Sequence, residues 1–365
     1  MLNINNNSKC KLCLVNDLEN VGSHIFTDAL IRSAIYIEGK SKRGDFEAIV
    51  EMSYKKLGFE YFGNSVLPED RENILGHQQS DKEIEATSTN PFINRNIVCR
   101  SCEKSFSPIE MYFINKIYTK LLDSDNFSND GLYQTNKEEY LISYVFILIN
   151  IWRTSAAKYN DWSLDSGYEE LIRSYLLLVL SQASITDMIN VANDTMSSIS
   201  CFQFAIFSLN QTEGAPSENA ILVDYTTEPY VFLLNRLLII FSSNCFETVG
   251  PPASIANIST RAEIIDLSSS HSKLKVKLIS NENRRNLLRK FYLDRWSDLV
   301  NHTKNVLSYA YNCFTGQILP NSYHLELEHR IGVFIKADGK GTPEALINLS
   351  AIFLKEILDE QFKEE

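Results

Sequence analysis

The chain carries Cys10-Lys-Leu-Cys13 near its N-terminus and repeats this C-x2-C spacing in Cys99-Arg-Ser-Cys102. Thiolates hold Zn²⁺ tetrahedrally, and a C-x2-C turn presents two of them to one ion, so two such turns predict a structural zinc site. The alternative is two thiol motifs that share no metal, because compact zinc ribbons close within about 15–20 residues and 85 residues separate these pairs. A long insertion remains compatible with zinc, since loop-closure entropy grows only logarithmically with length.

The length and composition of the chain limit how many domains it forms and which classes of protein it can belong to. The 365 residues suit two or three sub-domains, and a content of 44% apolar and 22% charged residues is typical of a folded protein. The 35 Lys and Arg residues against 46 Asp and Glu give a net charge of −11. This balance excludes general polyanion binding over the whole surface, so any nucleic-acid contact requires a local basic patch.

The N-terminal segment is polar and lacks a signal-peptide pattern, so we expect no targeting segment. Two apolar runs, Leu141–Trp152 and Tyr230–Phe241, are shorter than the roughly 20 residues that span a bilayer and are predicted to be buried helices. We expect no membrane contact. Reduced cysteines favour a cytoplasmic protein, and the three remaining cysteines are predicted to be core residues: Cys201, Cys245 and Cys313.

The residues around the two cysteine pairs narrow the interpretation. Ser23-His24-Ile25 follows the first pair, Asn94 lies five residues ahead of the second pair, and Glu103 follows it directly. This arrangement resembles the treble-clef core of HNH-type endonucleases, whose zinc-bearing members have a first C-x2-C, an Asp-His-Ile element, an Asn, and a second C-x2-C followed by His.

The resemblance implies catalytic roles for three residues. His24 would be the general base that activates water, Asn94 would orient the hairpin, and Glu103 would stand at the metal-binding position. Ser23 and Glu103 depart from the Asp and His of the family. Glu103 is still a hard oxygen ligand suited to Mg²⁺ or Mn²⁺, with Ser23 binding through water. The alternative is that Ser23 and His24 pack the hairpin and Glu103 stabilises a helix N-terminus.

A second resemblance concerns the helical segment Ile149-Asn-Ile-Trp-Arg-Thr-Ser155 followed by Tyr168-Glu-Glu-Leu-Ile-Arg173. It is similar to an element of uncharacterised bacterial proteins that carry the same zinc unit and look like components of phage-defence loci. The alternative is structural: Trp152 fills core volume, and Arg153 pairs with a carboxylate such as that of Glu169 or Glu170.

The predicted fold class is α+β, mostly α. Four regions are expected along the chain: a treble-clef (HNH-like) zinc unit over 1–106 with an insertion at 27–93, a helical core over 107–215, a small β insertion over 216–280, and a helical region over 281–365. Apolar spacing predicts helices at 137–153, 166–180, 185–196, 283–300 and 344–362, with others at Phe46–Leu57 and from Ser107 onward. Strands are predicted at Ala220–Tyr225 and at Ser272–Ile279, where lysines alternate with apolar residues.

Residues 273–295 form a locally basic segment in an otherwise acidic chain. A strand would place its three lysines on one face, and two arginines four residues apart share one helical face. Phosphate contacts could be made there, whereas the alternative is a solvated face or an edge strand protected by lysines. The predicted nucleic-acid-binding residues are Lys273, Lys275, Lys277, Arg284, Arg285, Arg289 and Lys290.

Two functions therefore remain open from the sequence. The first is an HNH-like, metal-dependent nuclease or effector in bacterial phage defence. The second is a catalytically silent zinc adaptor that binds a protein partner in a multi-component system.

Overall fold

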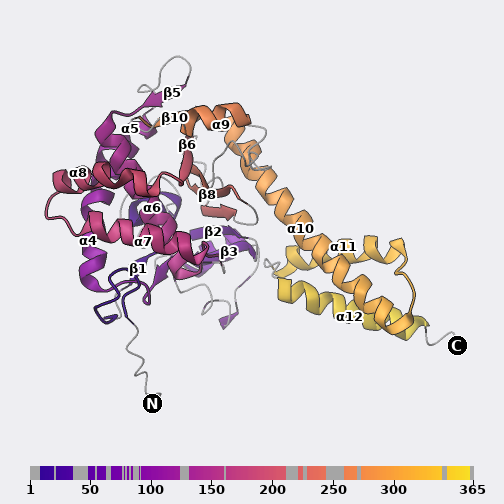
Figure 1. The fold of residues 1–365 in the computed structure, drawn as a ribbon. Coiled ribbons are helices and arrows are strands. Elements are labelled where there is room, and N and C mark those ends of the chain that lie inside the picture. The colour runs from indigo at the N-terminus through magenta and orange to yellow at the C-terminus, as the bar shows by residue number, and fades with distance from the viewer. Residues whose placement is uncertain are drawn as a thin grey trace. The chain divides into compact units, whose positions relative to one another are not determined.

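The computed structural model describes residues 9–19, 22–35, 48–53, 56–62, 67–75, 78, 80, 81, 84, 90, 92–123, 131–159, 162–210, 221–224, 228–243, 259–268, 273–338 and 343–361. The chain forms two compact units. The first comprises Met1–Ser41 and Asn90–Arg285, and the second comprises Lys42–Thr89 and Asn286–Glu365. Figure 1 labels their helices and strands.

Six strands of the first unit are hydrogen-bonded neighbours in the order β7-β8-β9-β6-β10-β5. Their bounds are β5 Leu132–Gln134, β6 Gln203–Leu209, β7 Ile221–Asp224, β8 Tyr230–Leu234, β9 Leu237–Ser242 and β10 Lys275–Ile279. The pair β10–β6 is parallel and the other pairs are antiparallel, so the sheet is mixed. The predicted class, α+β and mostly α, is confirmed.

The apolar run Tyr230–Phe241 is a hairpin of β8 and β9, so the prediction of a buried helix there was wrong. Asn235 and Arg236 form the two-residue connection, and Asn235 has a positive φ of 56°. Asparagine tolerates this left-handed conformation, which a tight hairpin needs. A pair of short apolar strands and one long buried helix have the same apolar composition. The residue at the turn, here Asn235, is what distinguishes the hairpin from the helix.

Helix α6 (Lys137–Ala157) is the central helix of the first unit. It begins with a capping box in which the Asn136 side chain accepts from the amide of Glu139 and the Glu139 side chain accepts from the amide of Asn136. The helix has the length and composition of a membrane span, but 94% of its most apolar window is buried inside the protein. Core helices of globular proteins have the same composition, so it is weak evidence for a membrane span.

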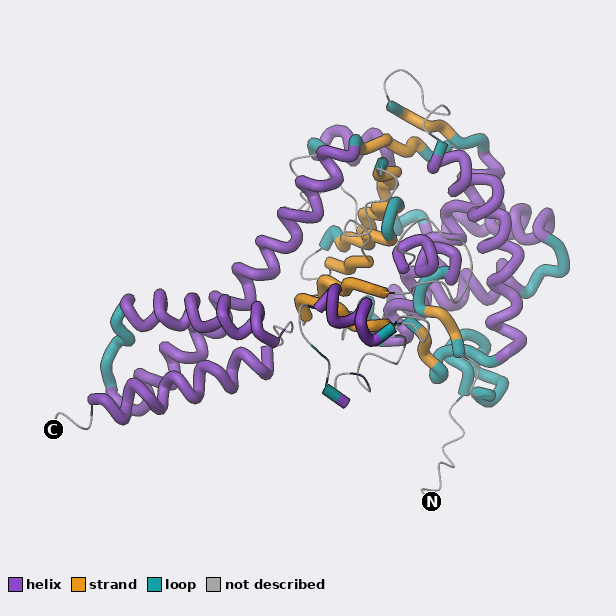
Figure 2. Tube along the Cα trace, turned by 180° about the vertical axis from the view of Figure 1, so that it is seen from behind, coloured by secondary structure: helices purple, strands orange, loops and turns teal. Residues whose placement is uncertain are grey.

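Further helices surround α6 as predicted. They are α7 (Ser166–Leu180) and α8 (Ile185–Thr195), which is followed by the short turn η4 (Met196–Ile199). In both views α4, α6, α7 and α8 gather on one side of the strands (Figure 1 and Figure 2). Tyr144 of α6 packs on Phe204 of β6 with ring centroids 4.9 Å apart, and its hydroxyl donates to the carbonyl of Ile199 at 2.8 Å.

The helix that leaves the second cysteine pair begins earlier than predicted. Helix α4 spans Arg100–Tyr112 and contains Pro108, whereas the sequence placed its start at Ser107. It continues through the π-helical turn η1 (Phe113–Tyr118) and α5 (Thr119–Leu122). The remaining helices of this unit are α1 (Asp28–Ile35) and α9 (Arg261–Ser268).

The second unit combines a hairpin with helices. The antiparallel strands β2 (Ala48–Ser53) and β3 (Lys56–Phe62) occupy the segment predicted as a helix at Phe46–Leu57, so that prediction was wrong. Its β-branched and aromatic residues suit a pleated strand better than a helix. The helix α2 (Pro68–Leu75) follows.

A three-helix bundle forms the rest of the second unit. It consists of most of α10 (Asn281–Thr315) with α11 (Asn321–Asp338) and α12 (Pro343–Gln361). Its core includes Leu307, Tyr311, Leu327, Leu346 and Phe353. These helices lie where the apolar spacing of the C-terminal region predicted helices.

Candidate metal centre

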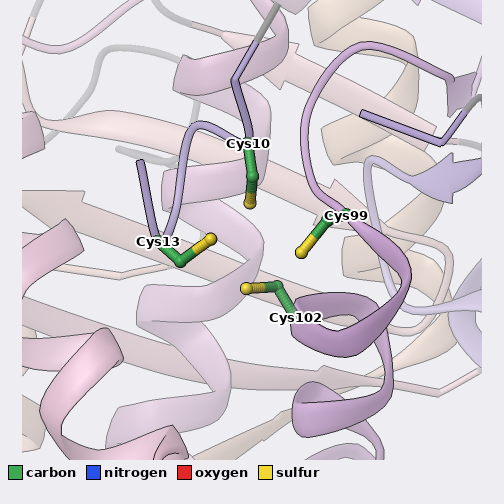
Figure 3. A group of neighbouring side chains, drawn as sticks. All are labelled: Cys10, Cys13, Cys99 and Cys102. Atoms are coloured by element: carbon green, nitrogen blue, oxygen red, sulfur yellow. The ribbon is translucent and has the colours of Figure 1, made fainter. Parts of the chain in front are cut away.

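Cys10 and Cys13 lie in a tight turn between Lys9 and Asp17, which form an isolated antiparallel bridge. The amide of Leu14 donates to the carbonyl of Cys10 at 2.9 Å and closes the turn. Leu14 follows with a positive φ of 59°. This geometry turns both thiols toward the same point (Figure 3).

Cys99 and Cys102 are positioned by the start of helix α4. Cys99 is the extended residue before the helix, and Cys102 lies in its first turn. The amide of Lys11 donates to the carbonyl of Ile97 at 2.8 Å, which ties the first turn to the segment that leads into the second pair. The positive end of the α4 dipole favours thiolates at this position.

The four Sγ atoms lie within 4.8 Å of one another and point toward a common centre (Figure 3). Tetrahedral zinc with bonds of about 2.3 Å would hold its sulfur ligands about 3.8 Å apart, so the cluster is of the right size. Cys10, Cys99 and Cys102 are buried, and Cys13 is half-buried. The prediction that these four residues form one cluster able to hold a metal ion is confirmed.

Hydrogen bonds between the thiols favour deprotonation at part of the cluster. The Cys102 thiol donates to Cys10, which lowers the pKa of Cys10 to about 4 and raises that of Cys102. Burial raises the pKa of Cys99, but hydrogen bonds from Ser101 and Asn16 outweigh burial and lower it overall. Metal binding needs thiolates, and such neighbouring donors orient and stabilise them.

Two side chains fasten the first turn to the helical core. Arg173 of α7 donates to the carbonyl of Leu12 at 2.6 Å. The ammonium group of Lys11 donates to the carbonyl of Ala156 at the end of α6. Each basic residue donates to a backbone carbonyl, so these two tertiary contacts help to fix the position of the cysteine turn.

The remaining cysteines differ from expectation. Cys201 and Cys313 are exposed, so the prediction that they fill the core was wrong for both, and Cys245 lies outside the described residues.

A buried charged network lies next to the cysteine cluster. The hydroxyl of Ser23, on strand β1 (Ser23–His24), donates to Oε2 of Glu103 at 2.6 Å. Oε1 of Glu103 lies 3.5 Å from Nη2 of Arg153, whose Nη1 donates to Oε1 of Glu110 at 2.7 Å. Arg153 is only 1% exposed, and its guanidinium stacks 4.0 Å from the ring centre of Phe106. Two α4 carboxylates therefore share one buried cation from α6.

Two further polar residues complete the network. The hydroxyl of Thr27 donates to Oε1 of Glu110 at 2.9 Å, and the amide of Thr27 donates to Oδ1 of Asn150 at 2.9 Å. Thr27, Glu110 and Asn150 are not recognisable as members of a polar network from the sequence. One sequence feature could have indicated the network. Asn150 and Arg153 are three residues apart, so these two polar side chains share one face of a strongly apolar helix.

Arg153 pairs with carboxylates, as the structural alternative predicted, but these belong to Glu103 and Glu110 and not to the suggested Glu169 or Glu170. Glu169 accepts a hydrogen bond from Ser155, and Glu170 pairs with Arg173 at 2.6 Å. The sequence positions of Glu169 and Glu170 on α7 could not show that two carboxylates of α4 lie closer to Arg153.

His24 and Asn94 lie on the two strands of a small antiparallel pair. Strand β4 (Ile93–Asn94) pairs with β1 in the register Ser23↔Asn94 and His24↔Ile93. Nε2 of His24 lies 3.3 Å from Oδ1 of Asp28, and its side chain is 27% exposed. Successive side chains of a strand point to opposite faces, so His24 points away from the side on which Ser23 meets Glu103. Among the described residues, the cysteine cluster is the group of three or more metal-ligating side chains that lie close together.

Carboxylates on α9 pair with part of the predicted nucleic-acid-binding set. Lys275 pairs with Asp266 at 2.6 Å and Lys277 pairs with Glu263 at 2.9 Å. Arg284 is fully buried and donates to the side chain of Asn235 at 3.3 Å, so it presents no surface to a polyanion. Lys273, Arg285 and Arg289 are exposed, and Lys275, Lys277 and Lys290 are half-exposed.

Comparisons of the chain with protein-family models, with curated proteins and with solved structures each gave no match.

Proposed function

We propose that Cys10, Cys13, Cys99 and Cys102 bind one structural Zn²⁺ ion in an HNH-like treble-clef unit. The close approach of the four Sγ atoms carries this proposal. The elements around them support it: a cysteine turn, the β1–β4 pair, and a helix whose first turn carries the last two thiols. All four coordination positions are filled by thiolates, which is the arrangement of structural rather than catalytic zinc.

Metal content and stability test the zinc site together. We expect about one zinc per chain, and loss of both zinc and native structure in Cys13→Ser, since structural zinc contributes on the order of 10 kcal/mol to folding of small zinc-finger peptides. Cys201→Ser is the matched control because Cys201 is exposed and outside the cluster. Native mass spectrometry and thermal melting give the two readouts. A metal-free native protein of unchanged stability would refute the proposal.

The zinc unit serves, on this proposal, as a binding module without nuclease activity. The single supporting observation is the Ser23–Glu103–Arg153 contact. A catalytic Mg²⁺ or Mn²⁺ at Glu103 would have to compete with the Ser23 hydroxyl, which donates to Oε2 at 2.6 Å, and with the Arg153 guanidinium, whose Nη2 lies 3.5 Å from Oε1. A buried guanidinium at this distance also repels a divalent cation, because charges interact strongly away from water.

We propose a cytoplasmic protein partner in a multi-component bacterial system, such as phage defence. The support for this part is the resemblance stated from the sequence and the need of a thiolate site for reducing conditions.

The second candidate function is a metal-dependent nuclease with His24 as general base. The observation that favours it is the His24–Asp28 pair, in which a carboxylate holds one ring nitrogen of a partly exposed histidine. This arrangement fixes the tautomer and leaves the ring accessible, as a general base requires. Asn94 would hold the neighbouring strand in register.

Nuclease assays separate the two candidates. The zinc-loaded protein is incubated with plasmid DNA and with RNA in Mg²⁺ or Mn²⁺. The binding module predicts intact substrates. Cleavage that His24→Ala removes, with zinc content and melting temperature unchanged, would establish the nuclease. Cleavage that survives His24→Ala would point to a contaminant.

Nucleic-acid binding is a separate question. Exposed cations contribute about one unit of salt slope for each phosphate contact. If nucleic acid is a partner, Arg285→Glu with Arg289→Glu should weaken binding and flatten its dependence on salt, as measured by fluorescence anisotropy across a salt series. Unchanged binding and slope in this double variant would exclude the patch.

A further inference from the structure

An open cleft of about 600 Å³ lies along helix α4 and the π-helical turn η1 of the first unit. Its apolar part consists of Pro108 and Met111 of α4 and of Ile185, the first residue of α8. Met111 is 60% exposed, although methionine is usually a core residue. Lys104 and Lys116 also line the cleft, and none of the described residues that line it is acidic. The cleft is therefore apolar and cationic in a chain with a net charge of −11.

The π-helical turn η1 brings the two lysines to the same side of this helix. At about 100° per residue, twelve residues of α-helix would rotate Lys116 about 120° away from Lys104. Hydrogen bonds of a π-helix run from residue i to i+5, so η1 winds more slowly than an α-helix and removes part of that rotation. Both lysines consequently line one cleft. Single π-helical turns within α-helices are frequent at functional sites.

The polar side chains of the cleft are available to a ligand. Among the residues that the structure describes, neither Lys104 nor Lys116 forms an ion pair, and the side chains of Ser107 and Asn115 make no hydrogen bond. Lys120, by contrast, pairs with a carboxylate at 2.6 Å. A ligand carboxylate would therefore not have to displace an acidic side chain from either lysine of the cleft.

Two acidic side chains lie close to residues in the middle of the lining. Glu138 accepts a hydrogen bond from the hydroxyl of Tyr112 at 2.8 Å, and Asp187 accepts one from Ser184, the N-cap residue of α8, at 2.6 Å. Neutral hydroxyl donors leave both carboxylates charged. The middle of the cleft therefore disfavours an anion, whereas its two lysines favour one.

We propose that this cleft binds an amphipathic α-helix of a protein partner that carries two acidic residues with apolar residues between them. The inference rests on the proposed function as a binding module and specifies the chemistry of its partner. The two lysines are twelve residues apart, or about 18 Å along the helix axis. In a bound helix, residues i, i+4, i+7 and i+11 share one face, and the first and last of them are about 16 Å apart. Acidic residues at i and i+11 would reach the lysines, while apolar residues at i+4 and i+7 would cover Met111.

The spacing of the charges selects a helix over other anionic ligands. A single phosphate or carboxylate cannot reach both lysines across about 18 Å. Double-stranded nucleic acid carries one charge per about 1.7 Å of its axis, so it would bring many phosphates against an apolar surface with only two cations. A helix that lacks acidic residues would cover the apolar side chains but leave both lysines unpaired.

Fluorescence anisotropy of a designed peptide with the full, zinc-loaded chain tests the proposal. The probe is a helical, alanine-rich peptide with glutamate at i and i+11 and leucine at i+4 and i+7. We expect a dissociation constant below about 100 µM, and at least a roughly tenfold loss when serines replace the leucines or glutamines replace the glutamates. The proposal fails if the peptide does not bind, if either altered peptide binds equally well, or if inorganic phosphate or duplex DNA displaces the peptide at constant ionic strength.

Charge reversal locates the site. The double variant Lys104→Glu with Lys116→Glu should bind the glutamate peptide at least about tenfold more weakly than the wild type does. A peptide with lysines in place of its glutamates should prefer the double variant, a result that misfolding cannot produce. Lys355→Glu is the control, because Lys355 is an exposed residue of α12 in the second unit. The proposal fails if this control weakens binding equally, or if the lysine peptide does not prefer the double variant.

Failure of this inference and failure of the proposed function give different results. If the peptide does not bind and the nuclease assays leave plasmid and RNA intact, the cleft is not the partner site, and the binding module remains. If the peptide binds through the two lysines and the protein also cleaves nucleic acid in a manner that depends on His24, the cleft is supported and the proposed absence of nuclease activity is wrong.

Discussion

Arg153 connects α6 to α4 through a single side chain. A guanidinium that is 1% exposed is stable only because Glu103 and Glu110 lie beside it and Phe106 covers its plane. The two carboxylates lie on the helix that carries Cys102, so the network links the cysteine cluster to the central helix. The network therefore orients the metal centre within the first unit.

Replacing Arg153 by methionine should be strongly destabilising. The substitution keeps the length of the side chain but leaves two carboxylates, 21% and 19% exposed, without their cation. We expect a loss of about 3 kcal/mol in the free energy of unfolding, the lower end for breaking a buried ion pair, since both carboxylates keep some contact with water. Urea denaturation measures the loss.

Arg32→Met is the control for this prediction. Arg32 pairs with Asp28 at the surface of α1, where such pairs contribute about 0.5 kcal/mol or less. A loss in Arg153→Met no larger than that in the control would show that the buried network does not stabilise the fold.

Gly22 illustrates a steric requirement next to the cysteine cluster. A Cβ at this position would lie 2.9 Å from Cγ2 of Ile93, on the strand that pairs with β1. We expect Gly22→Ala to cost about 1–2 kcal/mol of stability, which is typical of overpacking. Chemical denaturation measures it. The cost should shrink when Ile93→Ala removes the clashing methyl, and an unchanged cost in that background would argue for a backbone effect instead.

At the scale of secondary-structure elements, the start of α9 is held by a reciprocal cap. The amide of Thr260 donates to Glu263 at 2.8 Å, and the amide of Glu263 donates to the Thr260 hydroxyl at 3.3 Å. The hydrogen bond from the Thr260 amide and then that from Lys277 lower the pKa of Glu263 to about 2. Because Glu263 of the cap also pairs with Lys277 of β10, the same carboxylate links α9 to that strand.

The depressed pKa of Glu263 leads to a prediction of how thermal stability depends on pH. The folded-state pKa of Glu263 is depressed, so its contribution to stability is complete above the ordinary value of 4.5 and is lost as the pH falls toward about 2. In Glu263→Gln, the melting temperature should therefore fall less steeply between these two pH values than in the wild type. Parallel melting curves for the two proteins across this window would contradict the cap.

Elements also show where sequence patterns succeed. The helices α6, α7 and α8 follow from long apolar periodicity without glycine or proline breaks in their interiors. The strands β7 and β10 lie in segments predicted as strands, and in β10 lysines alternate with apolar residues. The hairpins β2–β3 and β8–β9 were mistaken for helices, because short apolar runs have no decisive period and register depends on the neighbouring strand.

At the scale of the whole molecule, the helical bundle of the second unit has a core of its own, whereas the cysteine cluster lies in the first unit. Removal of metal by a chelator should therefore act on one unit. Amide hydrogen exchange should accelerate around residues 9–19 and 92–112, while the bundle core that includes Leu327 and Phe353 keeps its protection. Equal loss of protection in both units would show that they unfold as one.

The sequence by itself determined the four cysteines of the cluster, the helical character of the chain and the main helices. These depend on local chemistry: thiolate spacing, apolar period and capping residues act within a few positions of one another. Only the tertiary structure decided that Ser23, Glu103 and Arg153 share one buried network, that His24 points away from it, and that Arg284 is buried rather than displayed. Such contacts join residues up to 123 positions apart, and their energies depend on which groups lose water together, which a one-dimensional pattern does not contain.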